Sequence, residues 1–310
     1  MNEKKFAIEI DLGATNIKGV LVDNNGNILK KKERETNDQT ESSQESGEVW
    51  KRAIYEMVQK FMEESERDIK AIGLAAPGLS DSQNTNISYM PGRLQGLEQF
   101  NWSQLLSEHQ LPVKVLNDAQ AALMAESQFG SAKGAENIVM LTLGTGVGGG
   151  VMINGELYQG NIQRAGHLGH ITVNSEGSPD ITGIPGSLED AIGDATVEKR
   201  SHGRFQSTRQ LVDAHKEGDY FATYLWFKSV RDLSVGISSL INAFSPDLVV
   251  LGGGITQAEE HLFDPLKKFL DLYEWRPGGR KTPIKKAKFG PVSGAIGAAA
   301  FSLSKLNKTY

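Results

Sequence analysis

One pattern occurs twice in this 310-residue chain and constrains the fold more than any other feature. An apolar segment at 6–10 stops at an Asp/Gly/Thr turn and continues as a second apolar segment at 17–22. Residues 138–153 repeat the arrangement, with Gly144-Thr145-Gly146 as the turn. Apolar runs bounded by Gly, Asn and Asp are typical of strands. The repeat therefore predicts a duplicated strand–turn–strand unit.

Strands and helices alternate along the rest of the chain, which indicates an α/β protein. Short apolar runs predict further strands at 28–35, 69–75, 113–116 and 248–251. Helical spacing predicts helices at 48–64, from 118 to about 129, and at 188–200, 207–217, 219–244, 257–270 and 294–306. No linker separates the halves, so we expect two domains that share a cleft, 1–118 plus 296–310 and 119–295.

Composition excludes several classes of protein. The absence of cysteine excludes disulfide scaffolds, thiolate metal sites and cysteine nucleophiles. The net charge of −5 argues against a nucleic-acid partner, because phosphate binding needs a basic face. No apolar run is long enough for a membrane span, and no secretory signal precedes the first strand, so we expect a cytoplasmic protein without a membrane partner.

Glycine is in excess, with 34 residues, or roughly 11% against the usual ~7%. Glycine permits positive φ and lets other groups approach the backbone. The clusters 144–150 and 252–254 each follow an apolar strand, so they are candidate ligand loops. A glycine-kinked strand and a simple strand–helix connection are the respective alternatives.

Two acidic positions at strand ends could carry chemistry. Asp11 could hold Mg²⁺ through water, beside a Gly turn whose N–H groups can cradle phosphate. Asp118 could accept a proton from an attacking hydroxyl, although an ordinary helix N-cap is the more common role for such a residue. A further pair, His167 and His170, could bind a metal, but we favour a role as polar loop residues or in hydrogen bonding to a ligand.

In this order, the pieces resemble the ROK family (repressor, open reading frame, sugar kinase), within the superfamily of actin, hexokinase and heat-shock chaperones. The resemblance covers Ala7 to Ala300. It is carried by IEIDLGATNIKGVLVD, QLPVKVLNDAQAALMAE, and LTLGTGVGGGVMINGELYQG followed by AGHLGH. It implies a two-domain actin-like ATPase (ribonuclease H-like) fold with duplicated β-hairpin phosphate-binding units.

The resemblance also implies an activity: ATP-dependent, glucokinase-like phosphorylation of a hexose on its 6-hydroxyl, with glucose as the default substrate and Asp118 as general base. A homodimer is implied as well. Sugar-binding positions by resemblance are Gly78, Asn117, Asp118, His167, His170 and Glu189. Nucleotide positions by resemblance are Asp11, which faces Mg²⁺ through water, together with Gly13, Ala14, Thr15, Lys18, Gly144, Thr145, Gly146, Gly253 and Gly254.

Two departures from the family pattern matter. His167 stands where the family has the Glu of Glu-x-Gly-His, so the identity of the sugar is open. The family zinc motif Cys-x-Cys-Gly-x-x-Gly-Cys-x-Glu reads here as Asp180, Thr182 and Ser187 at the three cysteine positions, followed by Glu189. Tetrahedral structural zinc favours thiolate and imidazole, so we expect no structural zinc.

Two alternatives remain. Sugar-responsive transcriptional regulators of this family carry a helix-turn-helix before the first strand, whereas only five residues precede Phe6 here, and the chain is acidic. A non-sugar kinase or ATPase of the same superfamily would need neither Asn117-Asp118 nor the loop with His167 and Glu189.

Overall fold

The computed structural model describes residues 4–13, 15–36, 43–90 and 94–306. The chain divides into two compact units. The first comprises Met1–Gly134, Gln159–Arg164 and Pro291–Tyr310, and the second comprises Ala135–Tyr158 and Ala165–Gly290.

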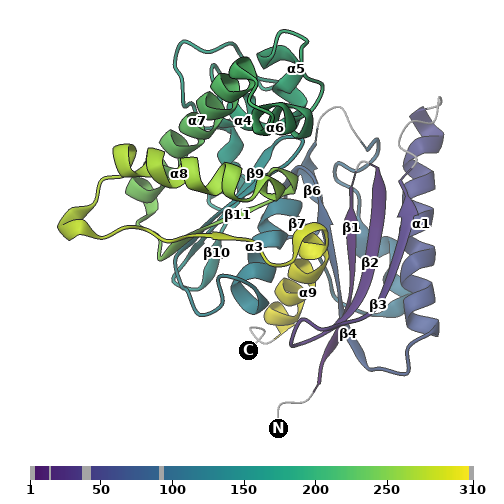
Figure 1. Cartoon of the computed structure of the whole chain (residues 1–310). Helices are drawn as coiled ribbons and strands as arrows, with labels where there is room; N and C mark the ends of the chain where they lie inside the picture. Colours follow the sequence, from purple (N-terminus) through teal and green to yellow (C-terminus); the bar gives the residue numbers. More distant parts are fainter. Residues whose placement is uncertain (1–3, 14, 37–42, 91–93, 307–310) are drawn as a thin grey trace. The chain divides into compact units, whose positions relative to one another are not determined.

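The first unit is built on a five-stranded sheet of order β3-β2-β1-β4-β7. Strands β1, β2 and β3 are antiparallel neighbours, whereas β4 and β7 run parallel to β1 (Figure 1). The strands are β1 (Phe6–Leu12), β2 (Asn16–Asp23), β3 (Ile28–Glu35), β4 (Ile69–Ala76) and β7 (Val113–Asn117), and a small separate sheet pairs β5 (Leu79–Ser80) with β6 (Ile87–Tyr89).

The second unit repeats this topology in a sheet of order β10-β9-β8-β11-β12. Its first three strands are again antiparallel, and β11 and β12 run parallel to β8. The strands are β8 (Ile138–Leu143), β9 (Val147–Ile153), β10 (Glu156–Tyr158), β11 (Leu248–Gly252) and β12 (Ile284–Lys286). The two equivalent sheets confirm the duplication and the α/β class that the sequence predicts.

The helices fall close to their predicted positions. In the first unit they are α1 (Ser43–Glu63), α2 (Trp102–Leu105), α3 (Asp118–Phe129) and α9 (Ser293–Leu306). In the second unit they are α4 (Leu188–Ile192), α5 (Val197–Arg200), α6 (Thr208–Lys216), α7 (Tyr220–Phe244) and α8 (Glu260–Tyr273). The single helix expected at 188–200 is broken at Gly193 into α4, a 3-10 turn and α5. Among the described residues, no helix is long and apolar enough to cross a membrane.

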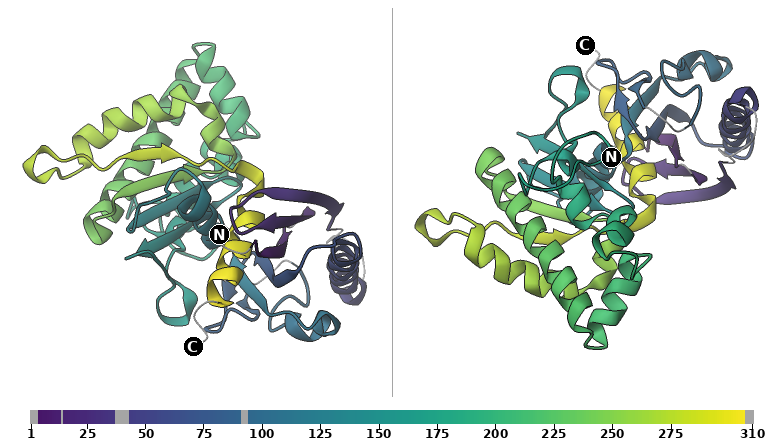
Figure 2. Two further views of the ribbon diagram at one scale, coloured as in Figure 1. Left: turned by 90° about the horizontal axis from the view of Figure 1, so that it is seen from below. Right: turned by 90° about the horizontal axis from the view of Figure 1, so that it is seen from above.

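Side-chain alternation in β1 separates the two faces of the first sheet. Ile8 and Ile10 belong to the buried cluster that includes Trp50 and Phe61 of α1. Ala7 belongs to the opposite cluster, which includes Ala295, Ala299 and Leu303 of α9. Figure 2 shows α1 and α9 on opposite sides of these strands.

The helices α3 and α9 pack closely because small residues line their contact. A Cβ on Gly297 of α9 would lie 1.6 Å from the carbonyl oxygen of Ala121 in α3. The alanine-rich composition of α9 therefore permits this close approach. This packing also explains why α3 and α9 belong to the same unit, which continues to Gly134. The boundary expected after residue 118 would instead assign α3 to the second domain and most of α9 to the first.

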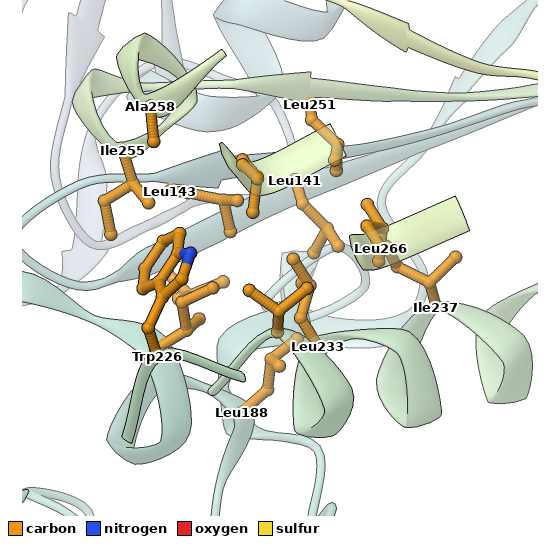
Figure 3. Packing of buried hydrophobic residues seen from close by; sticks show 14 of the residues in the cluster. Leu141, Leu143, Leu188, Trp226, Leu233, Ile237, Leu251, Ile255, Ala258 and Leu266 are labelled. Atoms are coloured by element: carbon orange, nitrogen blue, oxygen red, sulfur yellow. The ribbon is translucent and has the colours of Figure 1, made fainter. Parts of the chain in front are cut away.

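The core of the second unit lies between its sheet and the helices α7 and α8. Leu141 and Leu143 of β8 pack with Trp226 of α7 and with Ile255, which follows β11 (Figure 3). The indole N–H of Trp226 donates to the carbonyl oxygen of His261 at 2.9 Å, so this buried polar group is satisfied. The β11–α8 connection is thus fixed by packing on the sheet.

Glu9 is an exception in the first core, because its carboxyl group is fully buried on the α9 face of β1. Burial raises the pKa of Glu9 well above its usual value, and the negative charge of Asp11 raises it further. The amides of Ala299 and Ala298 act in the opposite direction. The Glu9 carboxyl group therefore binds a proton more tightly in the folded protein than in the unfolded chain.

This burial predicts a pH dependence of stability. The effect of a raised pKa is complete below the unfolded-chain value of 4.5 and is lost as pH rises toward the folded value. We therefore expect Glu9→Gln to flatten the fall in unfolding free energy between mildly acidic and alkaline pH, as measured by urea denaturation. Glu33→Gln, at an exposed position of β3, is the control and should leave the slope unchanged. Identical slopes for wild type and Glu9→Gln would contradict the prediction.

Candidate active site

Asp11 lies near the end of β1, opposite Lys18 of β2 in the antiparallel register. The first turn of α9 lies beside it, since a Cβ on Gly294 would be 3.3 Å from the carboxyl carbon of Asp11. Burial raises the pKa of Asp11 to about 7, the charge of Asp118 contributes in the same direction, and Lys18 opposes them. Asp11 and Asp118 therefore lie close enough to repel each other when both are ionised.

Asp118 is the first residue of α3, directly after β7. Taken as a whole, the residue is exposed to solvent. The neighbouring protein atoms nevertheless desolvate its carboxyl group and so raise its pKa, while the amide of Ala119 and the side chain of Asn117 act to lower it. Together these observations describe a carboxylate that a ligand can reach and that has a raised affinity for a proton. A general base needs both properties.

Asn117, rather than Asp118, is the N-cap of α3. Its Oδ1 accepts hydrogen bonds from the amides of Ala119 at 3.0 Å and Gln120 at 3.3 Å. Its Nδ2 donates to the carbonyl oxygen of Gly78 at 3.0 Å. The N-cap interpretation of Asp118 is therefore wrong, because its neighbour fills that position and leaves the Asp118 carboxylate in the first turn.

The backbone conformation at position 78 requires glycine. Its φ is +100°, and a Cβ would lie 2.5 Å from the carbonyl oxygen of Tyr89. Only glycine fits such a backbone without strain. The hydrogen bond to Asn117 places this turn next to the start of α3, so Gly78, Asn117 and Asp118 lie together.

The β1–β2 turn is held by a hydrogen bond within the turn and by hydrogen bonds from Thr36, which follows β3. The amide of Gly13 donates to the carbonyl oxygen of Asn16 at 3.0 Å, and Thr36 donates from its hydroxyl to the oxygen of Gly13 and from its amide to that of Thr15. Thr15 is exposed. Ala14, predicted as a phosphate-turn residue, lies outside the described residues. No sequence motif pointed to Thr36.

The equivalent β8–β9 turn is held by the segment after α4. The carbonyl oxygens of Gly144 and Thr145 accept hydrogen bonds from the amides of Asp194 and Ala195, each at 2.9 Å. On the other side, Oε2 of Glu189 accepts from the amide of Val147 at 2.9 Å. A Cβ on Gly146 would lie 2.3 Å from the same oxygen. Glu189 thus braces the turn, and only glycine at 146 leaves it room.

A cavity of about 680 Å³ opens beside this turn, which is a volume typical of small-molecule sites. Gly144 and Thr145 line it together with Gly254 and Ile255, which follow β11. Its remaining walls come from Asp194, Gln257, Ala258 and one side of α6, namely Thr208, Arg209, Val212, Asp213 and Lys216. The sequence identified the glycine turns but missed the α6 residues, because their helical spacing is that of any amphipathic surface helix.

Gly253 directly precedes Gly254 and Ile255, which line the cavity. Its backbone conformation explains why this position in the run 252–254 is glycine. Its φ is +87°, and a Cβ would lie 2.2 Å from the carbonyl oxygen of Leu143. By contrast, a Cβ on Gly254 would meet no described atom within 4 Å. The chain therefore leaves β11 against the end of β8, which brings the residues after 253 to the β8–β9 turn.

The glycines of β9 make room for the loop that carries the two histidines. A Cβ on Gly149 would lie 2.8 Å from the carbonyl oxygen of Gly166, and a Cβ on Gly169 would lie 2.0 Å from that of Val147. The group that approaches this backbone is therefore the protein's own loop 166–170. The short 3-10 helix Leu168–His170 packs directly on β9.

His167 and His170 lie near each other on this loop. Burial lowers the pKa of His167, and the neighbouring His170 lowers it further. No described residue forms a hydrogen bond with Nε2 of His167, which is buried. His170 directs its Nδ1 to Oδ2 of Asp180 at 3.3 Å. His167 therefore has a buried polar atom that a ligand could satisfy.

Comparison with known proteins decides the family. The ROK family model matches residues 7–305. The chain belongs to the ROK family. It is 32% identical to a glucokinase of Halalkalibacterium halodurans, over 94% of this chain and 93% of the relative. The ROK hexokinase of Thermus thermophilus has a similar structure, with a TM-score of 0.82, 30% identity and coverage of 97% and 99% of the two chains.

A ROK glucokinase of Streptomyces griseus, solved with glucose and AMPPNP, also superposes, with a TM-score of 0.79, 25% identity and coverage of 96% and 99%. Other ROK relatives differ in function. An N-acetylmannosamine kinase of Haemophilus influenzae is 28% identical over 94% of this chain and 93% of the relative. The xylose repressor of Bacillus subtilis is 25% identical, over 95% of this chain and 76% of the repressor. The chain is thus similar to sugar kinases of more than one named specificity and also to a repressor.

The contrast between Gly253 and Gly254 can be tested by stability. We expect Gly253→Ala to lower the unfolding free energy by at least ~1–3 kcal/mol, the cost of holding a residue with a side chain at φ +87° and ψ 170°, a backbone region essentially restricted to glycine. Its Cβ would also clash with the carbonyl group of Leu143. Gly254→Ala is the matched control and should unfold at nearly the wild-type midpoint. Urea denaturation of both variants measures the difference, and equal midpoints would contradict the geometry.

Proposed function

We propose that this chain is an ATP-dependent hexose kinase that phosphorylates the 6-hydroxyl of its sugar, with glucose as the default substrate. The observation that supports it most is the Asp118 carboxylate, which is exposed at the start of α3 and has a raised pKa. The glucokinase relatives and the AMPPNP complex of the Streptomyces griseus relative support the same reaction.

The proposed step needs little covalent chemistry from the protein. As the sugar oxygen attacks the γ-phosphorus, the bond from this phosphorus to the β–γ bridging oxygen breaks, and ADP leaves. The Asp118 carboxylate accepts the hydroxyl proton as the new O–P bond forms. Asn117 and Gly78 fix the position of Asp118, because the Asn117 side chain caps α3 and binds the Gly78 carbonyl.

The nucleotide is proposed to occupy the cavity beside the β8–β9 turn. Gly144 and Thr145 line one wall and Gly254 another. Asp11 would hold Mg²⁺ through water, and its donor chemistry fits, because its carboxylate and that of Asp118 repel each other without a cation. Bound there, Mg²⁺ would neutralise phosphate charge. Lys18, opposite Asp11, adds a fixed positive charge on the same turn.

The sugar is proposed to bind His167, His170 and Glu189. The lowered pKa keeps the His167 imidazole neutral near pH 7, so it offers one donor and one acceptor. The glutamate of relatives offers acceptors only, which suits two sugar hydroxyls. A neutral imidazole can instead donate to a carbonyl oxygen. N-acetylated hexosamines are therefore the second candidate substrates, and the Haemophilus influenzae relative supports this class.

The family resemblance also supports a homodimer in the cytoplasm. A ROK regulator without kinase activity and an ATPase that ignores sugars are the competing functions. Sugar-dependent ADP release separates the proposal from both, because a regulator would release no ADP and a sugar-independent ATPase would release it at the same rate without sugar.

The role of Asp118 predicts a large loss of turnover on neutralisation. Asp118→Asn should fold normally and bind nucleotide, yet lose roughly 10²–10⁴-fold in kcat, the usual contribution of a general base. Coupled ADP-release kinetics measure kcat, and circular dichroism checks folding. Glu260→Gln, a carboxylate in the first turn of α8, is the control and should retain full activity. Near-wild-type turnover by Asp118→Asn would reject the assignment.

The role of His167 predicts a change in sugar preference. A panel of glucose, N-acetylglucosamine, N-acetylmannosamine, mannose, fructose and allose should give different rankings for the wild type and for His167→Glu. We expect His167→Glu to shift kcat/KM toward unsubstituted hexoses, because a carboxylate cannot donate to an acetyl carbonyl. The same ranking for both proteins would show that this position does not select the sugar.

A further inference from the structure

The carboxylate of Asp180 is the centre of the loop between His170 and α4. Its side chain has no exposed surface. Oδ1 accepts three hydrogen bonds: from the amide of Thr182 at 2.8 Å, from the hydroxyl of Thr182 at 2.7 Å, and from the amide of Ile184 at 3.0 Å. One oxygen thus folds residues 180–184 into a tight turn.

The same carboxylate reaches two other segments. Oδ2 faces Nδ1 of His170 at 3.3 Å. The side chain of Ser187 also donates a hydrogen bond to Asp180, and its oxygen caps α4 by accepting from the amide of Asp190 at 3.2 Å. Burial alone would raise the pKa of Asp180, but the donors around it hold that pKa well below its usual range. The group therefore remains a carboxylate at any physiological pH.

These contacts join the three positions at which the family zinc motif has cysteine. Thr182 and Ser187 each direct a donor at the Asp180 carboxylate, so the three side chains are not arranged as ligands around an ion. The carboxylate of Asp180 already accepts hydrogen bonds from N–H and O–H groups. The partial positive charge on these hydrogens would repel a cation at the same place. Across the described ranges, no group of three or more His, Cys, Asp or Glu side chains could hold a metal. The residues present do not fit zinc.

We propose that Asp180 acts in place of a metal as the positioning residue of this loop, and that it holds His170 in the tautomer with hydrogen on Nδ1. An ionised carboxylate only accepts hydrogen bonds, so the ring nitrogen that faces it must donate. In the neutral ring, Nε2 of His170 is then the acceptor, which is complementary to the O–H of a sugar. The proposal rests on the proposed function in one respect, because the ligand of Nε2 is taken to be the sugar.

The decisive variant is Asp180→Asn, which keeps the shape of the side chain. Its Oδ1 can still accept from Thr182 and Ile184, but its Nδ2 now presents a donor to His170. The histidine should change to the tautomer with hydrogen on Nε2 and lose its acceptor toward the ligand. We expect the sugar KM to rise roughly 10- to 100-fold, as for other orienting contacts, while the KM for ATP is unchanged.

The tautomer can be read directly in the wild-type protein. Long-range ¹H–¹⁵N correlation spectra of the chain labelled at its six histidines distinguish the two forms, and the missing signal in His170→Gln assigns the residue. We expect hydrogen on Nδ1 in the wild type and on Nε2 in Asp180→Asn. Hydrogen on Nε2 in the wild type would overturn the proposal, whatever the behaviour of Asp180→Asn.

Thr182→Val is the matched control. It removes one donor to Asp180 and leaves both the amide contacts and His170 untouched. It should lower the thermal midpoint modestly, by the loss of one hydrogen bond, with the sugar KM and the His170 signal unchanged. If Asp180→Asn behaves like Thr182→Val in all three measurements, the carboxylate only braces the loop and the proposal fails.

A metal assay completes the test without any substrate. Protein purified and dialysed against EDTA should contain no zinc and should show the same thermal midpoint with and without added Zn²⁺. Equimolar zinc, with a midpoint lowered by EDTA, would overturn the proposal. These spectroscopic and metal measurements do not depend on turnover. A chain that phosphorylates no sugar would therefore reject the proposed function while leaving the role of Asp180 to be decided by the tautomer.

Discussion

Close backbone contacts around the β8–β9 hairpin determine where the functional groups of the second unit lie. Gly169 packs against the carbonyl of Val147, and Gly253 packs against that of Leu143. Gly146 leaves space for the carboxylate of Glu189. At each point a Cβ would overlap a backbone or carboxylate atom, so the histidine loop, α4 and the chain after β11 can converge on one hairpin only through glycine.

The first unit contains a different constraint, which is electrostatic. Glu9, Asp11 and Asp118 all have raised pKa values, and burial is the first cause for each. Charge on Asp118 raises the pKa of Asp11, and charge on Asp11 raises that of Glu9. Such a series of acids is costly in a protein without bound cations. It becomes favourable when a cation is present, which suits the proposed phosphoryl transfer.

In the loop around Asp180, we propose that hydrogen bonds replace a structural metal in holding several segments together. A zinc ion attracts ligands from several segments toward one point. Here a buried carboxylate gathers donors from Thr182, Ile184 and Ser187, and faces His170. The two kinds of centre need opposite partners. A carboxylate needs hydrogen-bond donors around it, whereas a zinc ion needs ligand atoms that offer lone pairs. The loop must therefore supply donors to this carboxylate, and the hydroxyls of threonine and serine are stronger donors than a cysteine thiol.

The sequence by itself determined the duplicated fold, because the strand–turn–strand repeat and the apolar periodicity are local signals that directly report each element. It also located Asp118, the two glycine turns and the unusual His167, since these lie in short contiguous motifs. It could not show that Asn117 caps α3, that Thr36 closes the first turn, or that α6 lines the cavity beside the β8–β9 turn. Nor could it show that Thr182 and Ser187 both direct donors at Asp180. Those facts depend on contacts between segments distant in sequence or on side-chain direction, which only the packed tertiary structure decides.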